Sequence, residues 1–111
     1  MLNFEWSVPA TVVRVYDGDT LTCELDLGWK MRLHDQNIRL HGINAPEMNT
    51  PGGIVARDYV RKLLPIGTEV TIRSRKLDKY GRVLGNVALP DGRDLSDLMI
   101  SSGHAVPYMV D

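Results

Sequence analysis

Opposite charges stand at the two ends of the short run "RLHGINAPE", which extends from Arg39 to Glu47. A strand that ends at Gly42 and a turn at Pro46 would explain the middle of the run, but neither explains the two charges. A planar guanidinium binds a phosphate through two hydrogen bonds, and a carboxylate can take a proton from water. The run therefore indicates a site for a negatively charged group that water attacks.

The turn "DGDT", at residues 17–20, carries two aspartates around a glycine. Asp-Gly pairs are common in turns, so this stretch taken alone predicts a turn after a strand. Asp19 also offers the hard oxygen ligand that a divalent cation prefers. The ligand spacing of an EF-hand is absent, so an autonomous calcium loop of that kind is excluded.

A third charged stretch, "DKYGR", covers residues 78–82. Such a run usually forms a hairpin turn whose charges face solvent. The functional interpretation places Arg82 at the mouth of the fold as a second guanidinium. Lys79 and Tyr80 would then contact the phosphate of a nucleotide or stack on its base or sugar.

Phosphodiester hydrolysis requires the groups that these three stretches supply. The attacking water must lose a proton, and the phosphate oxygens gain negative charge in the transition state. Two guanidinium groups, a carboxylate that binds a cation and a second carboxylate that acts on water form a consistent set. Each stretch alone is a weak signal, but their combination predicts a metal-assisted site that cleaves nucleic acid.

Hydrophobic patterning predicts the elements that must position these groups. Alternating or β-branched runs predict three strands, then an amphipathic helix with Thr50 as its cap, two more strands, and a short helix capped by Asp94. This order predicts a mainly β fold with helices, the five-stranded Greek-key barrel of the OB-fold, in which one helix separates strands three and four. The expected strands are 10–16, 21–27, 30–43 with a bend at 35–37, 68–77 and 83–89; the expected helices run from residue 51 to before 65 and from 95 to 102.

Composition limits how the chain can bind a polyanion. Its net charge is −1 and its pI is about 6.3, whereas strong sequence-independent binding of nucleic acid usually needs a basic surface. Any nucleic acid must therefore bind through a local cluster of positive charge. The length of 111 residues predicts a single domain, 1–111, which we expect to be a monomer.

The remaining sequence features concern location and redox chemistry. The N-terminus lacks the basic start and long apolar stretch of a secretory signal, and no apolar run is long enough to span a bilayer. We therefore expect a cytoplasmic protein without a membrane partner. Cys23 is the only cysteine, and its place on the apolar face of a strand predicts a buried, inert thiol.

In their order and spacing, "DGDT", "IRLHGINAPE" and "DKYGR", followed by "LPDGRDLSDLMISSGHA", resemble the staphylococcal nuclease-like (thermonuclease) family. The resemblance covers residues 12–108, and three motifs in series are far more specific than any one of them. It implies an OB-fold barrel, in agreement with the strand order above. It also implies a calcium-dependent endonuclease that hydrolyses DNA and RNA phosphodiesters with little sequence preference.

The same resemblance assigns roles to individual residues. It places Arg39 and Arg82 on the scissile phosphate, where they stabilise the transition state, and it matches Glu47 to the residue that activates or positions water. It implies that three further residues bind the substrate, namely Lys79, Tyr80 and Tyr108.

The implied calcium ligands are Asp19, Asn44 and the backbone carbonyl of Ala45. Asn44 departs from the family pattern, which has an aspartate there. An amide oxygen still coordinates calcium, but one negative charge is lost, so we expect weaker calcium binding.

A second hypothesis is a catalytically weak or inactive barrel that binds nucleic acid or protein. Inactive relatives are expected to lose the arginines or the glutamate. The presence of Arg39, Glu47 and Arg82 together favours the enzyme, whereas Asn44 favours the binding module.

Overall fold

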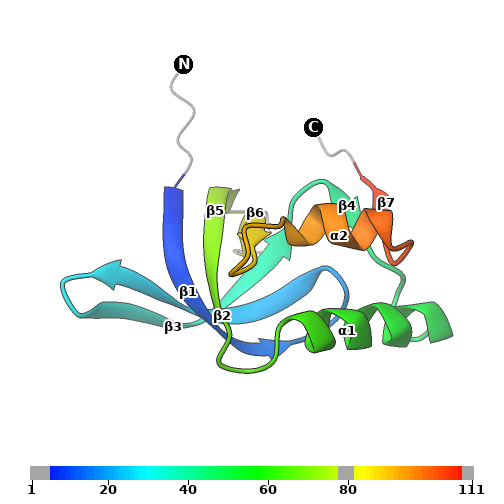
Figure 1. Cartoon of the computed structure of the whole chain (residues 1–111), viewed down its shortest axis with the longest axis horizontal. Helices are drawn as coiled ribbons and strands as arrows, with labels where there is room; N and C mark the ends of the chain where they lie inside the picture. Colours follow the sequence, from blue (N-terminus) through cyan, green and yellow to red (C-terminus); the bar gives the residue numbers. More distant parts are fainter. Residues whose placement is uncertain (1–5, 78–81, 109–111) are drawn as a thin grey trace, which may run out of the picture.

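Five strands pair edge to edge and close into a barrel in the computed structural model, which describes residues 6–77 and 82–108 (Figure 1). The order around the barrel is β1-β2-β3-β6-β5; β3 and β6 run parallel, and the other four pairings are antiparallel. This closed barrel confirms the OB-fold prediction. The barrel strands are β1 (Trp6–Val15), β2 (Thr20–Gly28), β3 (Met31–Leu40), β5 (Glu69–Leu77) and β6 (Val83–Ala88).

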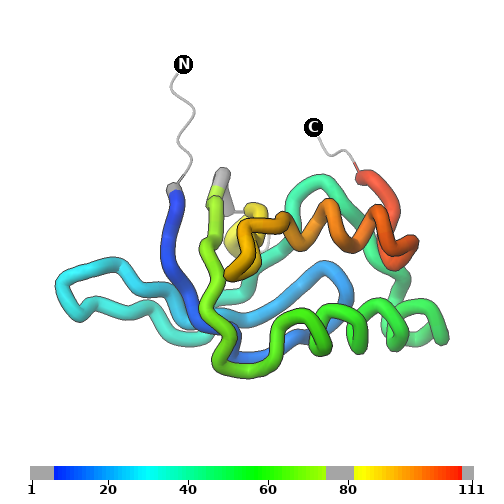
Figure 2. The backbone as a smooth tube through the Cα atoms, viewed as in Figure 1, coloured from blue at the N-terminus to red at the C-terminus, as the bar shows by residue number. Residues whose placement is uncertain are grey.

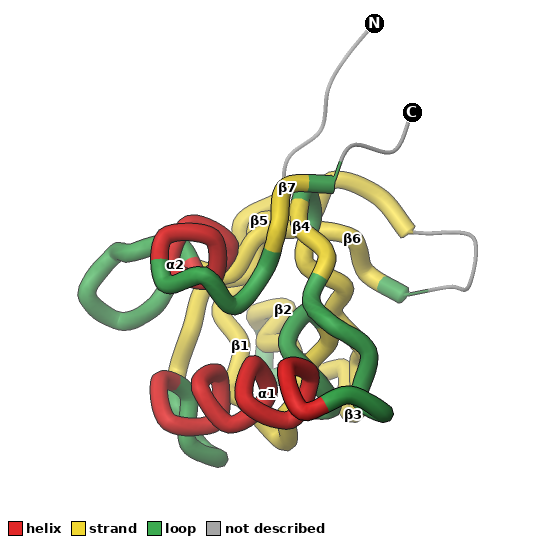
Figure 3. Tube along the Cα trace, turned by 90° about the vertical axis from the view of Figure 1, so that its right-hand side faces the viewer, coloured by secondary structure: helices red, strands yellow, loops and turns green. Residues whose placement is uncertain are grey.

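Two helices cover one side of the barrel, opposite a long β2–β3 hairpin (Figures 1 and 3). Helix α1 (Pro51–Leu63) begins at the predicted cap, where the Thr50 hydroxyl accepts a hydrogen bond from the Gly53 amide at 3.1 Å. Helix α2 (Leu95–Ser101) begins where Asp94 accepts a bond from the Asp97 amide at 3.1 Å. Within the described residues, no helix is long and apolar enough to cross a membrane.

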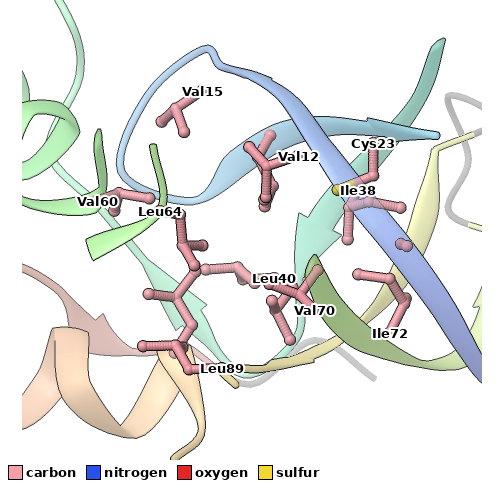
Figure 4. Packing of buried hydrophobic residues seen from close by; sticks show 14 of the residues in the cluster. Val12, Val15, Cys23, Ile38, Leu40, Val60, Leu64, Val70, Ile72 and Leu89 are labelled. Carbon is pink, nitrogen blue, oxygen red and sulfur yellow. The ribbon is translucent and has the colours of Figure 1, made fainter. Parts of the chain in front are cut away.

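Apolar side chains from both sheets and helices fill the barrel interior (Figure 4). Their alternation along the strands follows the predicted period of two, because successive strand side chains point to opposite faces. Burial raises the pKa of the Cys23 thiol to about 12, which keeps it protonated at neutral pH and agrees with the expected inert cysteine. The fully buried side chains include Val12, Leu21, Ile38, Leu40, Val60, Leu64, Ile72, Val87, Leu95 and Met99.

The β2–β3 hairpin departs from the expected pattern, because its outer half extends beyond the barrel (Figure 2). Alternation along β2 would place Leu27 on the same buried face as Leu21, yet Leu27 is exposed on the outer half of the hairpin. The same alternation would place Thr22 on the solvent face, yet Thr22 is buried, and its hydroxyl donates to Asn37 of β3. A bend was expected at 35–37, but β3 runs through these residues as a strand; a register shift against β2 lies between Leu33 and Gln36, with Asp35 in the left-handed region at φ 53°.

The sequence predicted no strand after α2, but two residues of the segment that follows this helix form one. Strand β7 (Val106–Pro107) pairs antiparallel with β4 (Ile43–Asn44), the two-residue strand that follows β3. The Tyr108 amide donates to the Gly42 carbonyl at 2.9 Å, which extends the contact by one residue. Residues 106–108 therefore lie beside the segment that carries Asn44 (Figure 3).

Candidate active site

The "DGDT" turn joins β1 to β2 and directs the Asp19 side chain into the protein. The amides of Tyr16 and Asp17 both donate to the Thr20 carbonyl, and the Asp17 carboxylate accepts a bond from the Asp19 amide at 3.0 Å. Asp19 is only 8% exposed. Its Oδ2 accepts the Ala45 amide at 2.9 Å, and its Oδ1 accepts the Thr20 hydroxyl at 3.2 Å. The buried carboxylate therefore has hydrogen-bond partners on both oxygens, as burial of a charge requires.

Gly18 allows this turn to lie against the segment that follows β4. A Cβ atom at position 18 would lie 2.7 Å from the Ala45 Cβ and 2.9 Å from the Ala56 Cβ of α1. Real side chains do not approach so closely, so only glycine fits without movement of a neighbour. The contact explains how Asp19 reaches a residue 26 positions away along the chain.

Arg39, on β3, lies at the point where these segments meet. Its Nη2 is 3.5 Å from Asp19 Oδ2 and donates to Asn44 Oδ1 at 3.3 Å, while its Nη1 donates to the Leu40 carbonyl at 2.8 Å. The side chains of Arg39 and Asp19 are 14% and 11% exposed, so the ion pair is largely shielded from water. Three predicted site residues, Asp19, Arg39 and Asn44, are therefore in direct contact.

Glu47 follows Asn44 and Ala45 on the loop that leads to α1. Its side chain is exposed, whereas its backbone carbonyl accepts bonds from both the Thr50 amide at 3.0 Å and the Thr50 hydroxyl at 2.6 Å. A Cβ atom at Gly53 would lie 2.0 Å from that carbonyl oxygen, so glycine is required for this approach. The start of α1 thus fixes the backbone of Glu47 and leaves its carboxylate in solvent.

Asp17 carries a perturbed carboxyl group that the sequence did not single out. The pKa of Asp17 is raised to about 6, chiefly by burial and in addition by the side chain and the negative charge of the neighbouring Asp19. Two carboxylates two residues apart resist simultaneous ionisation, and a cation would relieve this repulsion. The sequence signal was the repeated aspartate around one glycine, but its effect on the pKa depends on burial.

The oxygen atoms of Asp19 and Asn44 are of the type that a hard divalent cation binds. Asp19 Oδ2 and Asn44 Oδ1 both approach the same cationic nitrogen of Arg39, so the two oxygens converge on one positively charged point. Carboxylate and amide oxygens are the ligands that calcium prefers. Within 6–77 and 82–108, no group of three or more His, Cys, Asp or Glu side chains is arranged to hold a metal.

Four other predicted site residues remain, namely Arg82, Tyr108, Lys79 and Tyr80. Arg82 immediately precedes β6 and lines a surface groove together with Asp17 and Thr20. Tyr108 follows β7, and its side chain is half exposed. Lys79 and Tyr80 lie outside the described residues.

Comparison with known proteins then decides the family. Residues 37–111 match the model of the family described as staphylococcal nuclease homologue. The chain belongs to this family. It is 36% identical over 110 residues to an uncharacterized endonuclease of Escherichia coli, an alignment that covers 95% of this chain and 67% of that protein.

Two further relatives differ in the share of their length that this chain covers. The chain is 31% identical to the micrococcal nuclease of Shigella flexneri, over 92% of this chain and 63% of that protein. It is 30% identical to endonuclease YhcR of Bacillus subtilis strain 168, over 89% of this chain but only 9% of that protein. The staphylococcal nuclease match begins at residue 37, and the earlier turn reaches the matched region through the contacts of Asp19 with Ala45 and Arg39.

Substitution of Gly18 by alanine is expected to push the turn away from Ala45 and to destabilise the fold by about 1–3 kcal/mol. Gly18 does not have a positive φ, so the cost is one of space rather than backbone conformation. Urea denaturation of Gly18→Ala measures the loss. The double variant Gly18→Ala, Ala45→Gly removes the closest clash and is expected to recover part of it. Equal stability of Gly18→Ala and the wild type would contradict the close packing.

The raised pKa of Asp17 predicts a specific pH dependence of stability. The folded state holds the Asp17 proton more tightly than the unfolded state, so this contribution is fully present below pH about 3.8 and is lost as pH rises through about 6. Asp17→Asn should lack that loss, because asparagine keeps the accepting oxygen but does not titrate. The difference in unfolding free energy, variant minus wild type, is therefore expected to increase between pH about 4 and 6, measured in the presence of a chelator.

The matched control for the pH experiment is Asp26→Asn. Asp26 accepts the same kind of turn bond, from the Gly28 amide at 2.9 Å, but lies in the hairpin. A pH-independent difference for Asp17→Asn, or the same pH-dependent difference for both variants, would rule out the burial of Asp17 as the cause.

Proposed function

We propose that the protein is a divalent-cation-dependent endonuclease that hydrolyses phosphodiester bonds of DNA, RNA or both, with calcium as its cation. The observation that carries the proposal is the direct contact of Arg39 with Asp19 and Asn44. It brings a phosphate-binding guanidinium to the oxygens that suit a hard cation. Relatives named endonuclease and micrococcal nuclease support nuclease activity in general.

Arg39 is suited to stabilise charge that develops on a phosphate. Its bonds to the Leu40 carbonyl and the Asn44 amide hold the guanidinium before substrate arrives, so little reorganisation is needed during the reaction. Low exposure also strengthens its interaction with an anion, because water screens the charge less. Arg82, beside the same turn, supplies the second guanidinium in this proposal.

In this proposal, Glu47 acts on the water that attacks the phosphate. Its side chain is exposed while its backbone carbonyl is held by Thr50, so an accessible carboxylate extends from a fixed backbone. The glutamate takes a proton from the water or orients it; the water oxygen then bonds to phosphorus as the bond to the leaving oxygen breaks. Asp19, Asn44 and the Ala45 carbonyl would hold calcium, which supplies positive charge beside the phosphate.

The proposal predicts calcium-dependent cleavage of heat-denatured DNA that is lost on chelation. Glu47→Gln is expected to lower kcat by about 10²–10⁴-fold, because the amide cannot accept the proton. Arg82→Ala is expected to cost about 10²–10³-fold through the loss of one charge-stabilising donor. The matched controls are Glu69→Gln and Arg73→Ala, which alter exposed charges on β5.

The outcomes of this assay separate the two hypotheses. Absence of cleavage by the wild type across a wide calcium titration would favour the binding module. Cleavage that survives Arg82→Ala undiminished would remove Arg82 from the mechanism even if the protein is a nuclease.

Asn44→Asp is expected to strengthen calcium binding. The new carboxylate would place a second negative charge where the Asn44 oxygen now meets Arg39, and calcium affinity increases with the charge of its ligands. The calcium concentration for half-maximal cleavage should decrease, and calorimetry with calcium alone should give a lower Kd. An unchanged or higher Kd would exclude Asn44 from the metal site.

A further inference from the structure

A groove on the outer face of the barrel crosses four neighbouring segments beside the candidate active site. Strand register aligns Arg14 of β1 with Thr22 of β2, and Thr22 with Asn37 of β3. The pairing of Ile38 with the first residue of β6 places Arg82 next in this row. The groove has a volume of about 490 Å³, within the range of roughly 300–1,000 Å³ usual for small-ligand sites.

The side chains in this groove suit a nucleotide. Arg14 is exposed, and its side chain has no hydrogen-bond or ion-pair partner among residues 6–77 and 82–108. Tyr16 is 61% exposed, which is high for a tyrosine next to a strand. Thr22 donates to Asn37 Oδ1 at 2.8 Å, which leaves the amide NH₂ group of Asn37 as a donor. Cation, aromatic ring and polar donors are thus present in one groove.

The charge of this groove distinguishes it from the other large groove of the barrel. The second groove, of about 500 Å³, contains Asp26 and Glu69 against the single cation Arg32, and it contains no aromatic side chain. A phosphate would meet a net negative lining there. The groove of Arg14 has two arginines, Arg14 and Arg82, against one acid, Asp17.

We propose that the groove binds the nucleotide adjacent to the scissile phosphate in a single-stranded substrate. Arg14 pairs with a backbone phosphate, and Tyr16 stacks on an unpaired base. A duplex keeps its bases paired and stacked on each other, so the aromatic contact selects single strands. The inference rests on the proposed function for the position of the scissile phosphate, since the groove shares Asp17, Thr20 and Arg82 with that site.

Binding of a short fluorescent oligothymidine to the full chain, measured by anisotropy with chelator present, tests the groove without cleavage. Tyr16→Ala is expected to weaken binding by about 5- to 100-fold through the loss of one stacked base, whereas Tyr16→Phe keeps the ring and most of the affinity. Arg14→Gln is expected to weaken binding and to reduce the slope of log affinity against log salt by about 0.7. Both residues are exposed, and circular dichroism checks that the variants remain folded.

Matched controls alter the same residue types elsewhere. Arg73→Gln removes an exposed arginine from β5, and Trp29→Ala removes an aromatic side chain that is 97% exposed at the hairpin tip. Unchanged binding in these controls, with loss in the Arg14 and Tyr16 variants, supports the groove. Equal losses in variants and controls, loss only in Trp29→Ala, or equal affinity for duplex and single strand would overturn it.

The calcium-dependent cleavage assay of the wild type separates this proposal from the function on which it rests. If cleavage occurs but Arg14→Gln and Tyr16→Ala bind as the wild type does, the groove proposal fails and the nuclease stands. If cleavage is absent but these variants still lose affinity, the groove binds single strands and the catalytic proposal fails.

Discussion

The buried carboxylate of Asp19 holds together the three segments on which the candidate site depends. It belongs to the turn after β1, accepts the Ala45 amide beyond β4, and pairs with Arg39 on β3. Replacing only one partner of such a shielded pair leaves a charge without compensation, which commonly costs about 3–5 kcal/mol. The same interaction therefore stabilises the barrel at this end and positions the groups proposed to act on a phosphate.

Close backbone approach is the second constraint, and glycine supplies it twice. Gly18 allows the turn to touch Ala45, and Gly53 allows α1 to begin against the Glu47 carbonyl. As a result, the backbone at the site is held in place while side chains that could react stay accessible. Backbone groups around Glu47 are fixed by hydrogen bonds, while the side chains of Glu47 and Asn44 are exposed to solvent.

Local patterns in the sequence predicted most of the fold, because caps and alternation are short-range signals. Thr50 and Asp94 cap helices as expected, and the strand order led to the closed barrel. The β4–β7 pairing was missed because it joins two-residue strands far apart in sequence, and neither has a period to detect. The exposure of Leu27 was missed because alternation shows two faces but not whether anything covers one of them.

The candidate site, like the fold, could be predicted only in part from the sequence. Residue types identified Asp19 and Arg39 as parts of one centre, the family resemblance added Asn44, and the structure places Arg39 in contact with both. Their roles in binding and catalysis stay predictions. The groove of Arg14 and Tyr16 could not be foreseen, since it depends on register across β1, β2 and β3. The same groove offers a way for a chain of net charge −1 to bind a polyanion. Affinity depends on the charge near the phosphate, because salt screens charges that are more than roughly 10 Å away. Two arginines in one groove can therefore outweigh the acids distributed over the rest of the surface.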